Sequence, residues 1–174
     1  MSGALSCIVQ KGLTNLSRVR LARPPYGCAR HVFSQQRVDL DFDLTTAADL
    51  ALFYQALLND GKALDGSRIW QSEMLLEARR IRTGGLIDPI RGITANRALG
   101  IVIAGHDGKG NLRGFGRTNS PQTFGHPGFG GQIGWADPVT GISFAYLTNG
   151  YDRNDLREGR RSVALSSLAG ACCN

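Results

Sequence analysis

The sequence lacks long apolar stretches and the cysteine patterns of metal sites. It has no run of about 18 apolar residues, the length a transmembrane helix needs, so no membrane span is expected. It also has no apolar segment near its start of the kind found in secretory signals. No two cysteines have Cys-x-x-Cys spacing, and none stands at metal-ligand spacing from a histidine, among Cys7, Cys28, Cys172 and Cys173. We therefore expect reduced thiols in a cytoplasmic protein, with no metal and no cofactor.

Net charge is absent from most of the chain. The formal net charge is +6, and residues 1–38 supply all of it, because they hold basic side chains and no acidic ones. A neutral body lacks the clustered basic face of a nucleic-acid-binding domain, so no nucleic-acid partner is expected. Residues 1–38 have the composition of a mitochondrial transit peptide but no amphipathic helical period. We interpret them as an irregular basic lead-in, with mitochondrial targeting as the minor alternative.

The length of 174 residues fits one folded domain. Residues 1–44 are predicted to be an irregular N-terminal segment, and residues 45–174 to be the folded body. The first predicted helix spans residues 45–60, with Thr46 as N-cap, Asp49 closing a capping box and Gly61 in the left-handed C′ position. Its predicted apolar face consists of Leu50, Phe53, Tyr54, Leu57 and Leu58.

A second helix is predicted over residues 72–81, with Ser72 as N-cap and an apolar face of Met74, Leu75 and Ala78. Short strands are predicted over residues 98–104, 112–118, 122–125, 132–136 and 142–147, with loops over residues 83–95, 107–111 and 137–141. A terminal helix over residues 153–168 offers Leu156, Val163, Leu165 and Leu168 for packing. Because tight turns join antiparallel strands, the sequence predicts an α+β fold, an antiparallel sheet with packed helices.

Glycine is concentrated around one histidine in the segment from Phe124 to Gln132, which reads FGHPGFGGQ. Glycines at this density let a backbone approach a ligand closely. A dinucleotide-binding loop opens a helix, whereas this segment leads into a predicted strand and holds no P-loop lysine. Taken alone, His126 is most simply an ordinary histidine at a strand end. The residues around it favour a site.

This segment, together with residues 135–138 and 143–150, resembles the C-terminal part of serine β-lactamase-like proteins. That family includes class C β-lactamases, D,D-peptidases and related carboxylesterases. The segment TTAADLALFYQALLND from Thr45 to Asp60 also resembles a helix that those proteins carry upstream of the motif. The likeness covers roughly residues 45–170 and implies a partial β-lactamase/transpeptidase-like fold.

The resemblance also implies roles for individual residues. His126-Pro127-Gly128 stands where the family has Lys-Thr-Gly or His-x-Gly on a strand that lines the active site. His126 would act electrostatically near the acyl carbonyl of a small ester or amide, and Gly128 would leave room for that substrate. The backbone N–H of Phe129 would be one of two oxyanion-hole donors. Pro127 lacks the hydroxyl that commonly contacts a β-lactam carboxylate, which favours an esterase.

The family's nucleophile and base are absent from this sequence. The nucleophile motif is Ser-x-x-Lys, but the residues three positions before Lys11, Lys62 and Lys109 are Ile8, Asn59 and His106. No tyrosine is followed two positions later by asparagine, as the Tyr-x-Asn motif requires. We therefore expect an incomplete hydrolase from a truncated or misassembled reading frame, inactive alone and able to self-associate through exposed sheet faces. Two alternatives stay open: a non-catalytic module that binds a ligand or partner, and an enzyme completed in trans by another chain.

Overall fold

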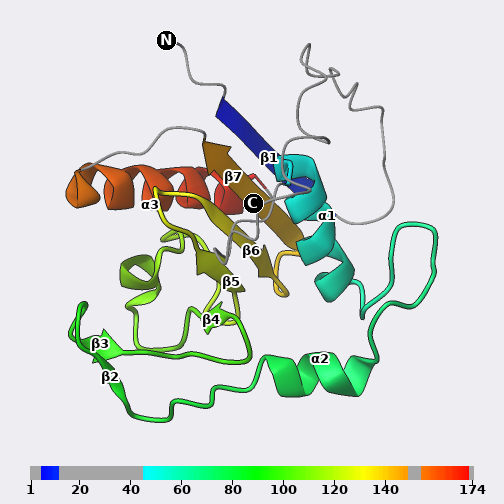
Figure 1. Cartoon of the computed structure of the whole chain (residues 1–174), viewed down its shortest axis with the longest axis horizontal. Coiled ribbons are helices and arrows are strands. Elements are labelled where there is room, and N and C mark those ends of the chain that lie inside the picture. The colour runs from blue at the N-terminus through cyan, green and yellow to red at the C-terminus, as the bar shows by residue number, and fades with distance from the viewer. Residues whose placement is uncertain (1–4, 12–44, 149–153, 173–174) are drawn as a thin grey trace, which may run out of the picture.

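The computed structural model describes residues 5–11, as backbone, and residues 45–148 and 154–172. A five-stranded antiparallel sheet in the order β1-β7-β6-β5-β4 forms its centre (Figure 1). Its strands are β1 (Leu5–Lys11), β4 (Val102–Ile103), β5 (Phe124–Pro127), β6 (Ile133–Asp137) and β7 (Ile142–Thr148). A separate two-stranded sheet pairs β2 (Ile87–Asp88) with β3 (Ile93–Thr94). The helices are α1 (Ala47–Leu58), α2 (Ser72–Ala78), α3 (Asp155–Ala171) and the 3₁₀ turn η1 (Gly110–Arg113).

Helices α1 and α3 cover opposite faces of the sheet. Alternate side chains of a strand point to opposite faces, and β7 follows this rule. Phe144 lies in the apolar cluster that includes Ala169 of α3, whereas Ala145 lies in the cluster that includes Ala51 of α1. All residues of β6 are buried, as a strand covered on both faces should be. The predicted α+β class with an antiparallel sheet is confirmed.

The N-terminus of α1 forms largely as predicted. Thr46 Oγ1 accepts the Asp49 N–H at 3.1 Å, but its hydroxyl also donates to the Asp49 carboxylate at 2.8 Å. The carboxylate therefore meets the side chain of the N-cap residue. At the other end, Asp60 takes the first left-handed position with φ 55°, and Gly61 follows with φ 77°. Asp60 thus occupies the C′ position predicted for Gly61, and Gly61 occupies the next position, C″. The Gly61 N–H donates to Ala56 C=O at 2.9 Å.

The buried face of α1 differs from the predicted one. The side toward the sheet includes the small residues Ala47 and Ala51 together with Tyr54. Phe53, predicted to be in the core, is 44% exposed and instead packs edge-on against Trp70, with ring centroids 5.6 Å apart. The buried face is therefore rotated around the helix axis relative to the face that the large apolar side chains predict. Small side chains such as Ala51 face the sheet because they allow the helix to approach it closely.

Helices α2 and α3 also pack differently from the prediction. Helix α2 ends at Ala78, its N-cap is Gln71 rather than Ser72, and Leu75 is its buried residue. Helix α3 extends beyond the predicted limit and buries small residues, namely Ser162, Ser166, Ala169 and Gly170. Leu156 and Leu168, which were expected to pack, are 77% and 67% exposed. The sheet accepts small residues here because the Trp135 indole fills the space and donates to Ser166 Oγ at 3.1 Å.

The predicted secondary structure needs correction in four segments. Residues 98–104 form only the short strand β4, and residues 112–118 form no strand, because η1 occupies their beginning. The loop predicted over residues 83–95 contains the β2–β3 hairpin. Residues 5–11, predicted to be irregular, form β1, which pairs with β7 from Leu5↔Thr148 to Lys11↔Ile142. Residues 12–44 lie outside the described part, and the domain boundary at residue 45 stays a prediction.

Candidate active site

The candidate site is built on the hairpin that joins β5 to β6. The two strands pair in antiparallel register, and the Gly128 N–H donates to Gln132 C=O at 2.7 Å to close the turn. Gly130 and Gly131 have φ of 83° and 85°, the left-handed region that glycine occupies without strain. The glycine-rich segment is therefore a tight turn between two strands, in keeping with the exclusion of a nucleotide-binding loop.

Helix α3 holds this turn from one side. Ser162 Oγ donates to Gly131 C=O at 3.2 Å. A Cβ at Gly131 would lie 2.7 Å from Glu158 Cγ and 2.8 Å from an Arg161 guanidinium nitrogen. The φ of Gly131 thus favours glycine, and any larger residue there would also have to displace the Glu158 and Arg161 side chains of α3. The turn has little room to move as long as α3 stays in place.

Helix α1 supports the same hairpin from the other side. A Cβ at Gly134 would lie 2.4 Å from Cε2 of Tyr54, so the tyrosine ring lies directly against β6. Burial raises the pKa of Tyr54 to about 12, although a hydrogen bond with the His126 backbone acts in the opposite direction. Tyr54 therefore stays a neutral phenol that connects α1 to the strand carrying the candidate histidine.

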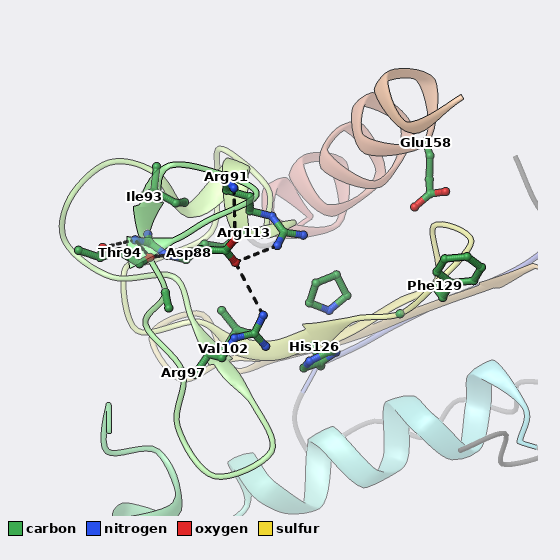
Figure 2. Close-up of a pocket in the computed structure, with 13 residues that line it drawn as sticks. Asp88, Arg91, Ile93, Thr94, Arg97, Val102, Arg113, His126, Phe129 and Glu158 are labelled. Atoms are coloured by element: carbon green, nitrogen blue, oxygen red, sulfur yellow. Dashed lines mark hydrogen bonds and ion pairs between the residues drawn. The ribbon is translucent and has the colours of Figure 1, made fainter. Parts of the chain in front are cut away.

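The structure places all three predicted site residues along one cleft. Strand alternation puts the exposed His126 side chain on the α1 face, with Phe124, and Pro127 on the opposite face. Figure 2 shows His126 on the side of β5 nearer to α1. Phe129 stands at the tip of the turn with 80% of its surface exposed. Gly128, Phe129 and Pro127 thus border the cleft on the α3 face, whereas the His126 side chain lies on the α1 face of the same strand, and the catalytic roles of all the predicted residues stay predictions.

Gly128 differs from the other glycines of this hairpin. A Cβ at Gly125 would lie 2.2 Å from Gly134 O, so packing alone requires glycine there. A Cβ at Gly128 would lie 3.4 Å from Gln132 Cβ, an ordinary contact, and its φ is not in the left-handed region. Neither the protein's packing nor its backbone conformation requires glycine at position 128. The open space beside it faces the cleft.

The cleft has a volume of about 350 Å³. Its walls come from the β2–β3 hairpin and the segment that follows it, from β4, from the β5–β6 turn and from the first turns of α3 (Figure 2). Its charged lining residues are Asp88, Arg91, Arg97, Arg113 and Glu158. Sequence reasoning missed all five, because no spacing connects them: Asp88 and Arg91 stand in a predicted loop, Arg113 in a predicted strand and Glu158 in a predicted helix.

Arg113 anchors the rear wall of the cleft. Its side chain is 2% exposed, and its guanidinium contacts Asp107 Oδ2 at 2.6 Å and Oδ1 at 2.8 Å. It also donates to Thr94 C=O at 2.7 Å and to Ala104 C=O at 2.7 Å. Hydrogen bonds from Arg113 hold the pKa of Asp107 well below its usual range. This buried arginine therefore fixes the end of β3 relative to the segment that follows β4.

Neither a metal cluster nor a membrane helix is found in the described ranges. Within residues 45–148 and 154–172, no group of three or more His, Cys, Asp and Glu side chains is placed to hold a metal ion. The helices of those ranges also lack the length and apolar content that would let one cross a bilayer.

Ser120, the serine closest in sequence to β5, has a structural contact. Its hydroxyl donates to the buried Asp137 carboxylate at 2.6 Å.

A family model and a curated relative both relate this chain to the same family. The model of the Beta-lactamase family matches residues 15–169. The esterase/beta-lactamase LipL of Mycobacterium tuberculosis is 35% identical over 106 residues, which cover 61% of this chain and 22% of LipL. This chain therefore spans about a fifth of the length of that curated relative.

Solved structures agree with this family. A beta-lactamase from Mycobacterium bovis superposes with a TM-score of 0.58 at 27% identity, over 73% of this chain and 44% of that one. A penicillin-binding protein homologue from Caulobacter crescentus shares the fold, with a TM-score of 0.52 at 23% identity over 72% of this chain and 32% of that one. The similarity thus spans most of this chain and less than half of each solved structure.

Proposed function

This chain belongs to the Beta-lactamase family, and we propose that it forms one wall of an esterase-type serine-hydrolase site without hydrolytic activity of its own. Enzymes of this chemistry need an activated serine to form the acyl-enzyme and backbone N–H donors to stabilise the oxyanion. The β5–β6 hairpin would supply a backbone N–H donor. The sequence contains no Ser-x-x-Lys pattern that would supply the activated serine.

One contrast carries the proposal. His126, Gly128 and Phe129 line a common cleft, yet no lysine of the sequence has a serine three positions before it. Loss of a serine nucleophile and its base typically costs about 10⁶ in kcat. A chain with this hairpin alone should therefore bind a small ester or amide much better than it turns one over.

The proposed roles follow the cleft geometry. Gly128 leaves space where a substrate would lie against the strand, which accounts for a glycine that neither packing nor φ requires. The Phe129 N–H would donate to the oxyanion. An electrostatic role of His126 would have to act across the strand, because its side chain lies on the α1 face of β5. Pro127 has neither a hydroxyl nor an N–H to offer a β-lactam carboxylate, which supports an ester substrate.

The test is covalent labelling. The purified full chain is treated with a fluorophosphonate probe, and its turnover of p-nitrophenyl butyrate and of nitrocefin is measured. We expect no labelled serine and no turnover above the buffer rate, while an intact serine hydrolase labelled in parallel shows that the probe is active. Stoichiometric labelling of any serine in the native chain, lost on heat denaturation, would contradict the proposal.

A non-catalytic binding module is the second candidate. The cleft itself favours this function, because all of its lining residues, from Asp88 to Glu158, belong to this one chain. This function requires a cooperative thermal transition of the isolated chain and a saturable response to a ligand; a molten, aggregating product would exclude it. Completion of the site in trans is a third hypothesis, and ester hydrolysis that appears only on co-expression with a chain carrying Ser-x-x-Lys would support it.

Self-association and cytoplasmic location stay predictions. Helices cover both faces of β6 and β7, so the large exposed apolar side chains lie elsewhere. Among the residues whose side chains the structure describes, the most exposed are Ile90 at 89% and Phe129 at 80%. Apolar surface of this kind is where copies of the chain would meet.

A further inference from the structure

One end of the cleft is built around Asp88. Its Oδ1 accepts the N–H groups of Ile90 at 2.9 Å and Arg91 at 3.2 Å, which fixes the carboxylate in the β2–β3 turn. Its Oδ2 lies 3.2 Å from the Arg91 guanidinium and 3.8 Å from that of Arg97. Figure 2 shows Asp88 between these two arginines. The backbone N–H groups and Arg91 hold the pKa of Asp88 below its usual range, so the carboxylate is ionised at neutral pH.

This cluster carries an excess of positive charge. Two guanidinium groups face one carboxylate, and Arg91 and Arg97 are 39% and 48% exposed, whereas the Asp88 side chain is 10% exposed. In the described part of the chain, Asp88 is the sole ion-pair partner of Arg97, at a distance too long for a hydrogen bond. The Arg97 guanidinium therefore keeps donors for a ligand. A guanidinium presents them in a planar fork that matches a carboxylate.

The other charged groups of the cleft give it polarity. Arg113 is already occupied by Asp107 and by backbone carbonyls at the rear wall. Glu158 lies at the opposite end, near Phe129 (Figure 2). A ligand with one negative charge is attracted to the Arg91–Arg97 end and repelled from the Glu158 end.

We infer that the Arg91–Arg97 end of the cleft binds the carboxylate of a small substrate whose ester or amide group lies toward Gly128 and Phe129. This inference rests on the proposed function and adds the substrate class: a monoester or monoamide of a dicarboxylic acid. A cleft of about 350 Å³ stands at the small end of ligand pockets, which suits a ligand of this size. A charge-assisted, forked contact supplies both affinity and orientation.

The test measures binding without turnover. The full chain, labelled with ¹⁵N, is titrated with monoethyl glutarate, which carries one carboxylate, and separately with the neutral diethyl glutarate. We expect saturable amide shifts in residues 88–97 and 128–131 with the monoester and much weaker effects with the diester. Arg97→Gln should weaken monoester binding by roughly 10-fold or more, the range for a hydrogen bond to a charged group.

Arg80→Gln is the matched control. Arg80 is 74% exposed, pairs weakly with Glu77 at 3.8 Å and does not line the cleft, so its loss should leave the affinity unchanged. Equal monoester and diester binding in the unsubstituted chain would overturn the inference without any variant. So would absence of monoester binding, or an affinity that Arg97→Gln leaves intact in a folded protein. A labelled serine, in contrast, would refute the inactivity proposal and leave the carboxylate site unaffected.

Discussion

The substitution Arg113→Leu removes the ion pair that joins the loops behind the cleft. In the folded protein the guanidinium bonds to both carboxylate oxygens of Asp107 and to the carbonyls of Thr94 and Ala104. Leucine fills part of the volume but replaces none of these donors. The carbonyls and the carboxylate then keep their places without a partner, or the loops separate to admit water.

The expected loss can be bounded from the burial of each partner. Breaking a buried ion pair by removing one side typically costs about 3–5 kcal/mol. The lower end applies here, because Asp107 is 33% exposed and can be rehydrated once Arg113 is gone. We therefore expect a loss of about 3 kcal/mol in the free energy of unfolding. For a chain of this length that corresponds to a decrease in Tm of roughly 6–12 °C.

The loss should depend on pH with a defined sign. The pKa of Asp107 is depressed in the folded state, so its contribution is fully present above the unfolded value of about 3.9 and is lost as the pH falls toward the folded value. In Arg113→Leu this contribution is absent at every pH. The stability difference between the two proteins should therefore be largest near pH 7 and shrink below about pH 4.

Urea denaturation followed by circular dichroism at pH 7, 5, 4 and 3 measures both effects. Arg80→Leu is the control, because an exposed pair is worth less than about 1 kcal/mol and should give a pH profile parallel to that of the unsubstituted chain. Asp107→Asn should remove most of the same pH dependence. A loss for Arg113→Leu no greater than that for Arg80→Leu, or a stability difference that stays constant down to pH 3, would refute the role of this ion pair.

Two further substitutions test the supports of the hairpin. Gly131→Ala should cost about 1 kcal/mol more than Gly141→Ala, because both have positive φ but only at position 131 does the added Cβ force the Glu158 and Arg161 side chains to shift; equal losses in chemical denaturation would exclude the helix contact. Tyr54→Phe should remove a decrease in stability between pH 10 and 12, because the raised pKa of about 12 means that only the unfolded chain ionises in that range. Denaturation curves at pH 9 and 11 give this slope, and parallel pH profiles for the two proteins would show that Tyr54 is not buried as described.

The elements that local chemistry dictates were predictable. Thr46 caps α1 because its hydroxyl oxygen accepts a backbone N–H of the first helical turn, an interaction that does not depend on what packs against the helix. The strands β5, β6 and β7 follow from β-branched and aromatic runs between tight turns. The turn after β6 follows from Asp137 and Gly141, because the Asp137 carboxylate accepts the Val139 N–H and Gly141 takes a φ of 72°.

Faces and distant contacts were not predictable in this way. The burial of Ala51 instead of Phe53 depends on how closely α1 approaches the sheet, which no periodicity within the helix encodes. Strand β1 pairs with β7 across most of the chain length, so its partner lies far outside any local window. Residues 112–118 read as a strand, but the burial of Arg113 against Asp107 favours a 3₁₀ turn there.

The sequence by itself determined the family resemblance, the α+β class, the hairpin with its His126-Pro127-Gly128 motif and the lack of a Ser-x-x-Lys pair, because each of these is written in consecutive residues. Tertiary structure alone decided what surrounds the motif. The β2–β3 hairpin, η1 and α3 bring Asp88, Arg113 and Glu158 to one cleft, although they stand far apart along the chain. The charge of that cleft, and with it the kind of substrate that we infer, arises from folding because packing sets which distant side chains share a surface.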